Sequence, residues 1–308
     1  MTLPTPRLII LHLIGLLLLL SGLLALNSCD SGPDRFSTSK GVIDLGNLTP
    51  LPPITATVQK ETIRIAVAAI LSPSGTIESY TPFMNYLEKT LGQPVHLIQR
   101  KTYQETNELL AQGSVDLAFI CTGAYREGVK LGIMSALVVP QINGRTTYQS
   151  YIITRTDSTI HNFDDLRGKI FSFTDPMSNT GYIYPLTLLS SRSETPDNFF
   201  DRTIFTYSHD RSIYAVADGV ADGAAVDNLI LAHAQQRQPE LAERLRIIQK
   251  SPEYGIPPVV IPNQLSPQKK AQFEQFFLNI HNQADGRLAL EALAIERFVK
   301  PDLTLYEF

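Results

Sequence analysis

Short apolar runs alternate with stretches of helical periodicity through most of this chain. The run at residues 63–67 predicts a strand, and residues 80–91 place Phe83, Tyr86 and Leu87 at the three- and four-residue spacing of an amphipathic helix. The same pattern predicts strands at 95–98, 115–121 and 137–139, with helices at 103–112 and near 125. Strands separated by helices of this length predict βαβ units and mostly parallel sheets.

After a turn-rich segment at 143–147 the alternation begins again. It predicts strands at 148–154, 169–173, 203–207 and 221–227, with a helix after each of the last three. The chain is therefore predicted to form two α/β lobes. Two such lobes leave a cleft between them, which is where ligand sites tend to lie.

Three polar segments directly follow predicted strands of the second half, at 175–182, at 208–210 and at Asp227. In parallel sheets a ligand lies beyond the carboxyl ends of the strands. The shared placement of these segments predicts that they contribute to one ligand site.

The segment 175–182, DPMSNTGY, has the composition of a loop that holds an oxyanion. Ser178, Asn179 and Thr180 lie where the following apolar stretch would begin a helix, and a helix start has unpaired N–H groups and partial positive charge. Two hydroxyls and an amide add donors, and Gly181 lets the backbone approach closely. The alternative is that Ser178 or Thr180 only caps the helix.

The N-terminal sequence predicts that the protein is exported. Arg7 precedes an apolar run at 8–20, so residues 1–28 are predicted to be a signal peptide. The LNSC sequence at 26–29 resembles a bacterial lipobox, in which the cysteine, here Cys29, receives lipid and begins the mature protein. The alternative is an uncleaved membrane anchor with an incidental cysteine. Either reading places the protein on the membrane surface, facing the periplasm or the cell exterior.

Residues 29–61 are rich in Ser, Gly, Thr and Pro without sustained periodicity, which predicts a flexible tether. The remaining residues are numerous enough to form a stable core without disulfides. With Cys29 lipidated, Cys121 has no partner for a disulfide or a cysteine-based zinc site. A formal net charge of −4 argues against nucleic acid as a partner.

The sequence lacks the common catalytic signatures: it contains no GxSxG, HExxH or Walker motif. Its six histidines show no metal-binding spacing. We therefore expect a binding protein without catalysis, cofactor or metal.

Several short blocks, in order along the chain, resemble one known family. They are PFMNYLEKTLG (82–92), VDLAF (115–119), DLRG (165–168), DPMSNTG (175–181), SHD (208–210) and GAAVD (223–227). The family is that of the phosphonate- and phosphite-binding proteins that feed ABC importers, a branch of the type 2 periplasmic binding proteins. The resemblance implies a two-lobed Venus-flytrap fold, with lobe 1 at 62–148 plus 258–308 and lobe 2 at 149–257.

The resemblance also implies which residues bind the ligand. Ser178, Asn179 and Thr180 match the positions that cradle the oxyanion, and His209 matches a further donor from lobe 2. Without the resemblance, His209 suits a helix cap equally well.

Three further positions face the ligand in that family. Tyr103 and Tyr148 match tyrosines from lobe 1 and the hinge, although either residue suits an ordinary half-buried aromatic. Asp227 lies near an acidic pocket position and also suits a helix cap. As a pocket residue it would accept a hydrogen bond from a P–OH group and reject sulfate-like anions.

Two departures from the family pattern bear on the ligand. Some relatives have a hydroxyl residue where this chain has Asn179. Relatives that select an aminoalkylphosphonate carry an acid near the second crossover, where this chain reads GIPPV at 255–259. A small ligand without an amine is therefore favoured.

Together these features predict a lipid-anchored, monomeric solute-binding protein. Its ligand is predicted to be phosphite, a phosphonate or phosphate, delivered to an ABC permease. The alternative is a sensor that presents the bound anion to a membrane histidine kinase.

Overall fold

The computed structural model describes residues 61–307 of the chain. The predicted signal peptide, Cys29 and the predicted tether up to residue 60 lie outside the described residues. Within 61–307, no helix combines the length and apolarity needed to cross a bilayer.

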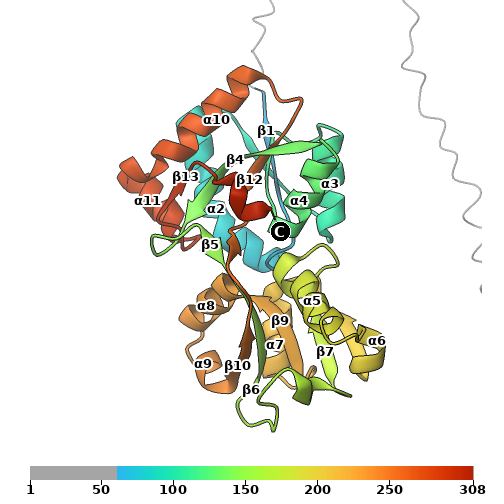
Figure 1. Ribbon diagram of the computed structural model, residues 1–308. Coiled ribbons are helices and arrows are strands. Elements are labelled where there is room, and N and C mark those ends of the chain that lie inside the picture. Colours follow the sequence, from blue (N-terminus) through green and yellow to red (C-terminus); the bar gives the residue numbers. More distant parts are fainter. Residues whose placement is uncertain (1–60, 308) are drawn as a thin grey trace, which may run out of the picture. The chain divides into compact units, whose positions relative to one another are not determined.

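The first lobe is built on a six-stranded sheet in the order β13-β4-β12-β3-β1-β2. Its strands are β1 (Ile63–Val67), β2 (Val95–Gln99), β3 (Leu117–Phe119), β4 (Met134–Gln141), β12 (Val259–Pro262) and β13 (Arg297–Val299). Its helices are α2 (Pro73–Leu91), α3 (Tyr103–Ala111), α4 (Thr122–Lys130), α10 (Pro267–Asn279) and α11 (Ala284–Glu291). One hydrophobic cluster packs α2, α10 and α11 against the sheet, and a second includes residues of α3 and α4 (Figure 1).

The second lobe is built on a five-stranded sheet in the order β10-β6-β9-β7-β8. Its strands are β6 (Ser150–Arg155), β7 (Ile170–Phe173), β8 (Arg202–Phe205), β9 (Gly223–Asp227) and β10 (Leu245–Lys250). Its helices are α5 (Tyr184–Ser190), α6 (Pro196–Phe199), α7 (His209–Ala217), α8 (Asn228–Arg237) and α9 (Glu240–Arg244). Two hydrophobic clusters form its core.

The chain passes between the lobes along a two-stranded ribbon. Strand β5 (Thr147–Tyr148) leads into the second lobe, and β11 (Tyr254–Gly255) leads back, paired antiparallel with β5 (Figure 1). The 3₁₀ turn η5 (Leu303–Tyr306) packs on this ribbon, and the Tyr306 hydroxyl donates to the Ile256 carbonyl at 2.6 Å. The ribbon therefore carries Tyr148 to the boundary between the lobes.

The prediction of mostly parallel sheets was wrong. Six of the ten strand pairings among the described residues are antiparallel. Every antiparallel pair includes a strand next to a crossover, namely β4, β5, β6, β10, β11 or β12. Hydrophobic periodicity reports which residues are buried, but it carries no information on the direction in which a returning strand enters a sheet.

Helix α2 begins earlier than predicted, at Pro73 rather than at residue 80. The Ser72 hydroxyl accepts a hydrogen bond from the Gly75 N–H at 3.4 Å, and proline occupies the first helical turn, where it needs no donor. The Ser-Pro pair at 72–73 marks the start of α2 in the sequence, whereas the spacing of apolar residues does not.

Candidate functional site

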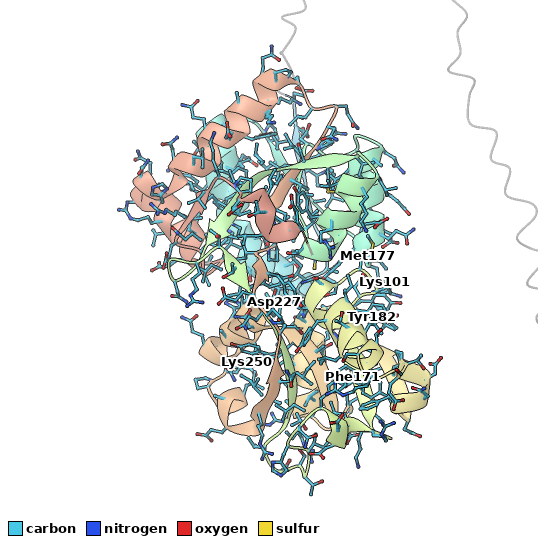
Figure 2. All side chains as sticks on the ribbon, in the orientation of Figure 1. Lys101, Phe171, Met177, Tyr182, Asp227 and Lys250 are labelled. Atoms are coloured by element: carbon cyan, nitrogen blue, oxygen red, sulfur yellow. The ribbon has the colours of Figure 1, made fainter. Side chains whose placement is uncertain are left out.

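All seven predicted binding residues are buried in the structure. Each lies at the end of a helix or strand. Tyr103 is the first residue of α3, His209 is the first residue of α7, and Tyr148 and Asp227 are the last residues of β5 and β9. Asn179 and Thr180 begin the π-helical turn η3 (Asn179–Ile183), and Ser178 directly precedes it. None of their exposed fractions exceeds 3%. Asp227 and the loop residue Met177 mark the level at which the two lobes meet (Figure 2).

The segment 175–182 forms a capped turn directly after β7. The Ser178 hydroxyl accepts from the Gly181 N–H at 3.0 Å, and the helix continues through η3 into α5. Ser178 is thus an N-cap, as the alternative interpretation had it, while its hydroxyl hydrogen stays available to donate.

Packing within the second lobe requires glycine at position 181. A Cβ atom at this position would lie 1.7 Å from Thr174 Oγ1, so the missing side chain permits packing of the turn against Thr174 within the same lobe.

His209 has a defined donor and acceptor. Its Nδ1 accepts the backbone N–H of Asp227 at 3.0 Å, and its Nε2 lies 3.4 Å from Ser178 Oγ. Burial lowers the pKa of His209 to about 3, so the ring is neutral and the accepting Nδ1 leaves the proton on Nε2. The side chain therefore presents an N–H donor towards Ser178.

The two tyrosines are protonated donors. Burial raises the pKa of Tyr103 and of Tyr148 well above the ordinary value of 10.0, and the charge of Asp227 adds to both shifts. This coupling shows that both phenols lie near Asp227. The Tyr148 hydroxyl is also close to Asn179, although the two do not reach hydrogen-bond geometry.

Several buried polar atoms of this site have no hydrogen-bond partner among the described residues. They are the Tyr103 and Tyr148 hydroxyls, Asn179 Nδ2, Thr180 Oγ1 and Ser208 Oγ. An unsatisfied buried polar group costs about 1–3 kcal/mol, so a cluster of five favours a ligand that accepts hydrogen bonds. Ser208 was not predicted individually as a binding residue, although the segment 208–210 was predicted to contribute to the site.

Asp227 is both a helix cap and a buried acid. Its Oδ1 accepts the Leu229 N–H at 2.7 Å, which starts α8. Burial raises the pKa of Asp227 from 3.8 to about 7, against the opposing effect of backbone hydrogen bonds from Leu229 and Ile230. The site thus combines neutral donors with one carboxyl group that is ready to hold a proton near neutral pH.

Contacts across the lobe boundary close this space. Asp175, in the second lobe, accepts the Tyr103 N–H at 3.0 Å and the Met177 N–H at 2.8 Å. Asp210 accepts the Ser72 N–H at 2.9 and 3.1 Å with its two oxygens. Each carboxylate reaches the start of a first-lobe helix, where it is favoured electrostatically. Sequence reasoning missed the function of both acids, although both lie in the blocks that carried the family resemblance.

Cys121 is a free, buried thiol whose pKa burial raises to about 11, so it is an unreactive neighbour of the site. Among residues 61–307, no group of three or more His, Cys, Asp or Glu side chains is arranged to hold a metal ion.

The family model described as the periplasmic substrate-binding protein of phosphonate ABC transporters matches residues 65–306. The chain belongs to this family. Members are substrate-binding components of transporters, in agreement with the prediction of a binding protein rather than an enzyme.

Two curated relatives are similar in sequence. The chain is 33% identical over 182 residues to the phosphate-import protein PhnD of Mycolicibacterium smegmatis, covering 55% of this chain and 56% of the relative. It is 27% identical over 251 residues to the phosphonates-binding periplasmic protein of Escherichia coli, covering 80% of this chain and 74% of the relative. The first match thus spans little more than half of that relative's length.

A solved structure confirms the predicted fold. The binding-protein component of an ABC phosphonate transporter from Pseudomonas aeruginosa superimposes with a TM-score of 0.75 at 24% identity, covering 80% of this chain and 83% of that one. This phosphonate-binding family member therefore has the two-lobed α/β fold of the type 2 periplasmic binding proteins.

Proposed function

We propose that this protein captures phosphite, a phosphonate or phosphate between its lobes and delivers it to the permease of an ABC importer. The main support is the cluster of buried, unpartnered donors at Tyr103, Tyr148, Asn179, Thr180 and Ser208, next to the His209 N–H. A tetrahedral oxyanion accepts several hydrogen bonds at once and would satisfy these groups. Family membership supports the transport partner.

The binding chemistry follows from the donors. Closure surrounds the anion with hydroxyl, amide and imidazole N–H groups in a space without water, where each hydrogen bond to a charged oxygen is stronger than in solution. Asp227 accepts a hydrogen bond from P–OH. Its raised pKa allows Asp227 and the ligand to share one proton, so that the buried pair carries less negative charge than two ionised groups would.

Substitutions in the cradle test this function. Ser178→Ala or Thr180→Ala removes a donor to a charged oxygen, a contribution of about 1.5–3 kcal/mol, so methylphosphonate should bind roughly 10- to 150-fold more weakly by calorimetry. Ser190→Ala and Thr187→Ala, on the exposed side of α5, are matched controls that should leave affinity unchanged. Unchanged affinity in both cradle variants would make the loop a helix cap only.

The membrane anchor is a further part of the proposal. Residues 1–28 are proposed to be cleaved before Cys29, which carries lipid, and residues 29–61 to tether the two lobes, 62–148 plus 258–308 and 149–257, to the membrane as a monomer. Cys29→Ser should abolish acyl labelling in cells and leave an unprocessed precursor on a gel. Normal processing of that variant would identify an ordinary signal peptidase site instead.

A further inference from the structure

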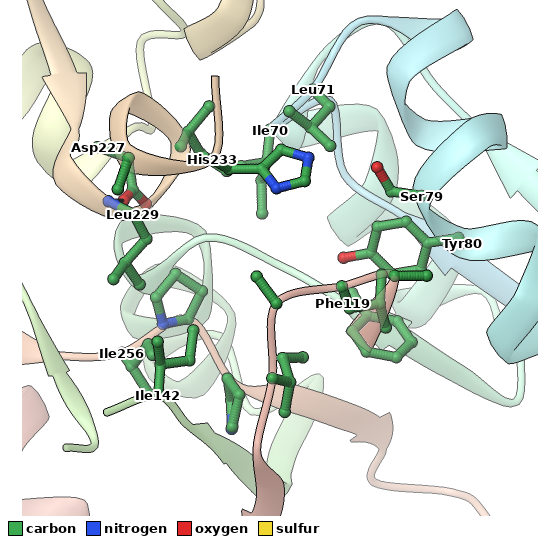
Figure 3. Close-up of a pocket in the computed structure, with 18 of the residues that line it drawn as sticks. Ile70, Leu71, Ser79, Tyr80, Phe119, Ile142, Asp227, Leu229, His233 and Ile256 are labelled. Atoms are coloured by element: carbon green, nitrogen blue, oxygen red, sulfur yellow. Dashed lines mark hydrogen bonds between the residues drawn. The ribbon is translucent and has the colours of Figure 1, made fainter. Parts of the chain in front are cut away.

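A cavity of about 310 Å³ lies between the lobes and has Asp227 in its wall (Figure 3). Its lining includes Ile70 from the first lobe, Leu229 from the second, and Ile256 and Pro257 from the return crossover. Among the described residues that line it, Asp227 is the sole carboxylate, and Lys and Arg do not contribute. The cavity is therefore largely apolar.

The wall opposite Asp227 is uncharged as well. Ser79 and Tyr80 stand there, with the Tyr80 hydroxyl pointing into the space (Figure 3). Ser79 Oγ is buried without a hydrogen-bond partner, and burial lowers the pKa of the nearby His233, which favours its neutral form. A charged group on a ligand would find no opposite charge on this wall.

The cavity adjoins the oxyanion donors. The Asp227 carboxyl lines the cavity, while the Asp227 N–H donates to His209, whose other ring nitrogen faces Ser178. Ile70 also lines the cavity, and its carbonyl accepts the backbone N–H of His209 at 3.0 Å. Asp227 thus belongs both to the cavity wall and to the hydrogen-bonded group of donors, so an anion that bonds to its carboxyl would lie next to the cavity.

The size of the cavity exceeds what an unsubstituted anion fills. An engineered apolar cavity of roughly 150 Å³ holds a benzene molecule, and this one is about twice as large. Phosphite and phosphate carry no carbon substituent, so neither reaches this volume. A short alkyl chain or a ring attached to phosphorus does.

We propose that the preferred ligand is a phosphonate whose phosphorus carries an uncharged, mainly apolar substituent of about four to six carbons, and that this substituent occupies the cavity beside Asp227. The inference rests on the proposed function and names the substrate class of the same site. Leu229 and Ile256 then determine selectivity by packing on the substituent.

A series of phosphonates with increasing chain length tests the inference. Methyl-, n-propyl- and n-butylphosphonate are titrated by calorimetry into the full-length protein in mild detergent. Each buried methylene should strengthen binding about fourfold, which gives about 60-fold from methyl to butyl. Leu229→Ala removes part of the cavity wall and should reduce this ratio to about tenfold or less. Leu288→Ala, an exposed position on α11, is the matched control and should keep it.

The outcomes separate this inference from the proposed function. Equal affinities for methyl- and butylphosphonate in the wild type, or a ratio that survives Leu229→Ala, would overturn the cavity assignment. If methylphosphonate binds and Ser178→Ala abolishes its binding, while all three phosphonates bind the wild type with equal affinity, then only the assignment of the substituent to the cavity is wrong. If none of the three phosphonates, nor phosphite or phosphate, binds, the proposed function itself fails.

Discussion

Replacing Asp227 by Asn should abolish the discrimination against sulfate. Sulfate carries no proton near neutral pH, so Asp227 must take one from solution before the two can share a buried site. In a cleft open to water, where the ordinary pKa value of 3.8 would hold, only roughly one Asp227 carboxyl in 1,600 is protonated at pH 7. A phosphonate brings its own proton, because the second pKa of an alkylphosphonic acid lies near or above neutral pH, and so it incurs little of this penalty. Sulfate should therefore bind at least about 100-fold more weakly than methylphosphonate.

The affinities for sulfate and for methylphosphonate should depend on pH in different ways. Burial raises the pKa of Asp227 to about 7, so closure on sulfate takes up a proton, and affinity is highest in acid and falls as pH rises. Sulfate affinity should fall about tenfold per pH unit from about pH 4 to 7. Methylphosphonate affinity should stay level until the pH reaches the second pKa of the ligand, near or above neutral pH, and fall with the same slope above it. Both slopes should vanish in Asp227→Asn.

The Asn variant keeps the acceptor that caps α8, so loss of the helix start does not confuse the comparison. Asp218→Asn, at an exposed side chain, is the matched control. Calorimetry with sulfate and methylphosphonate from pH 5 to 8 measures all four slopes. Equal slopes in the wild type and in Asp227→Asn would show that Asp227 does not hold the shared proton.

A charged tail should be the strongest penalty on the substituent side. 2-Aminoethylphosphonate should bind at least about 100-fold more weakly than n-propylphosphonate, which has the same number of heavy atoms. Its ammonium must lose water in a space where the crossover contributes Ile256 and Pro257 instead of an acid. An unpaired, desolvated charge costs several kcal/mol.

The acids near the cavity are already engaged. Glu78 pairs with Arg237, and both Asp210 oxygens accept from the Ser72 N–H. Competition between 2-aminoethylphosphonate and n-propylphosphonate, in the wild type and in Asp227→Asn, measures the penalty on the ammonium. 2-Aminoethylphosphonate could instead bind more tightly than n-propylphosphonate and lose this advantage in Asp227→Asn. Asp227 would then pair with the ammonium, and our assignment of the P–OH group as the partner of Asp227 would be wrong.

Local features of this protein followed from its sequence. The strand predicted at 169–173 is β7 (Ile170–Phe173), and the polar loop after it forms a capped helix start at Ser178. Such features depend on neighbouring residues: a short apolar run, then a hydroxyl side chain that satisfies the N–H groups of the next turn. The placement of ligand-type residues after strands was predictable for the same reason.

Tertiary contacts decided the rest. Strand direction at the crossovers depends on how the chain returns from the other lobe, and the role of Gly181 depends on Thr174, seven residues away. Neither relation is visible in local periodicity. The prediction of mostly parallel sheets was wrong for this reason.

The chemistry of the site shows the same division. The sequence by itself determined that hydroxyl, amide, imidazole and carboxyl groups would follow strands. Only the tertiary structure placed Tyr103 and Tyr148 near Asp227, joined the Asp227 N–H to His209 Nδ1, and surrounded the carboxyl closely enough to raise its pKa to about 7. Burial and charge coupling depend on distances between residues far apart in the chain, and local propensities do not encode such distances.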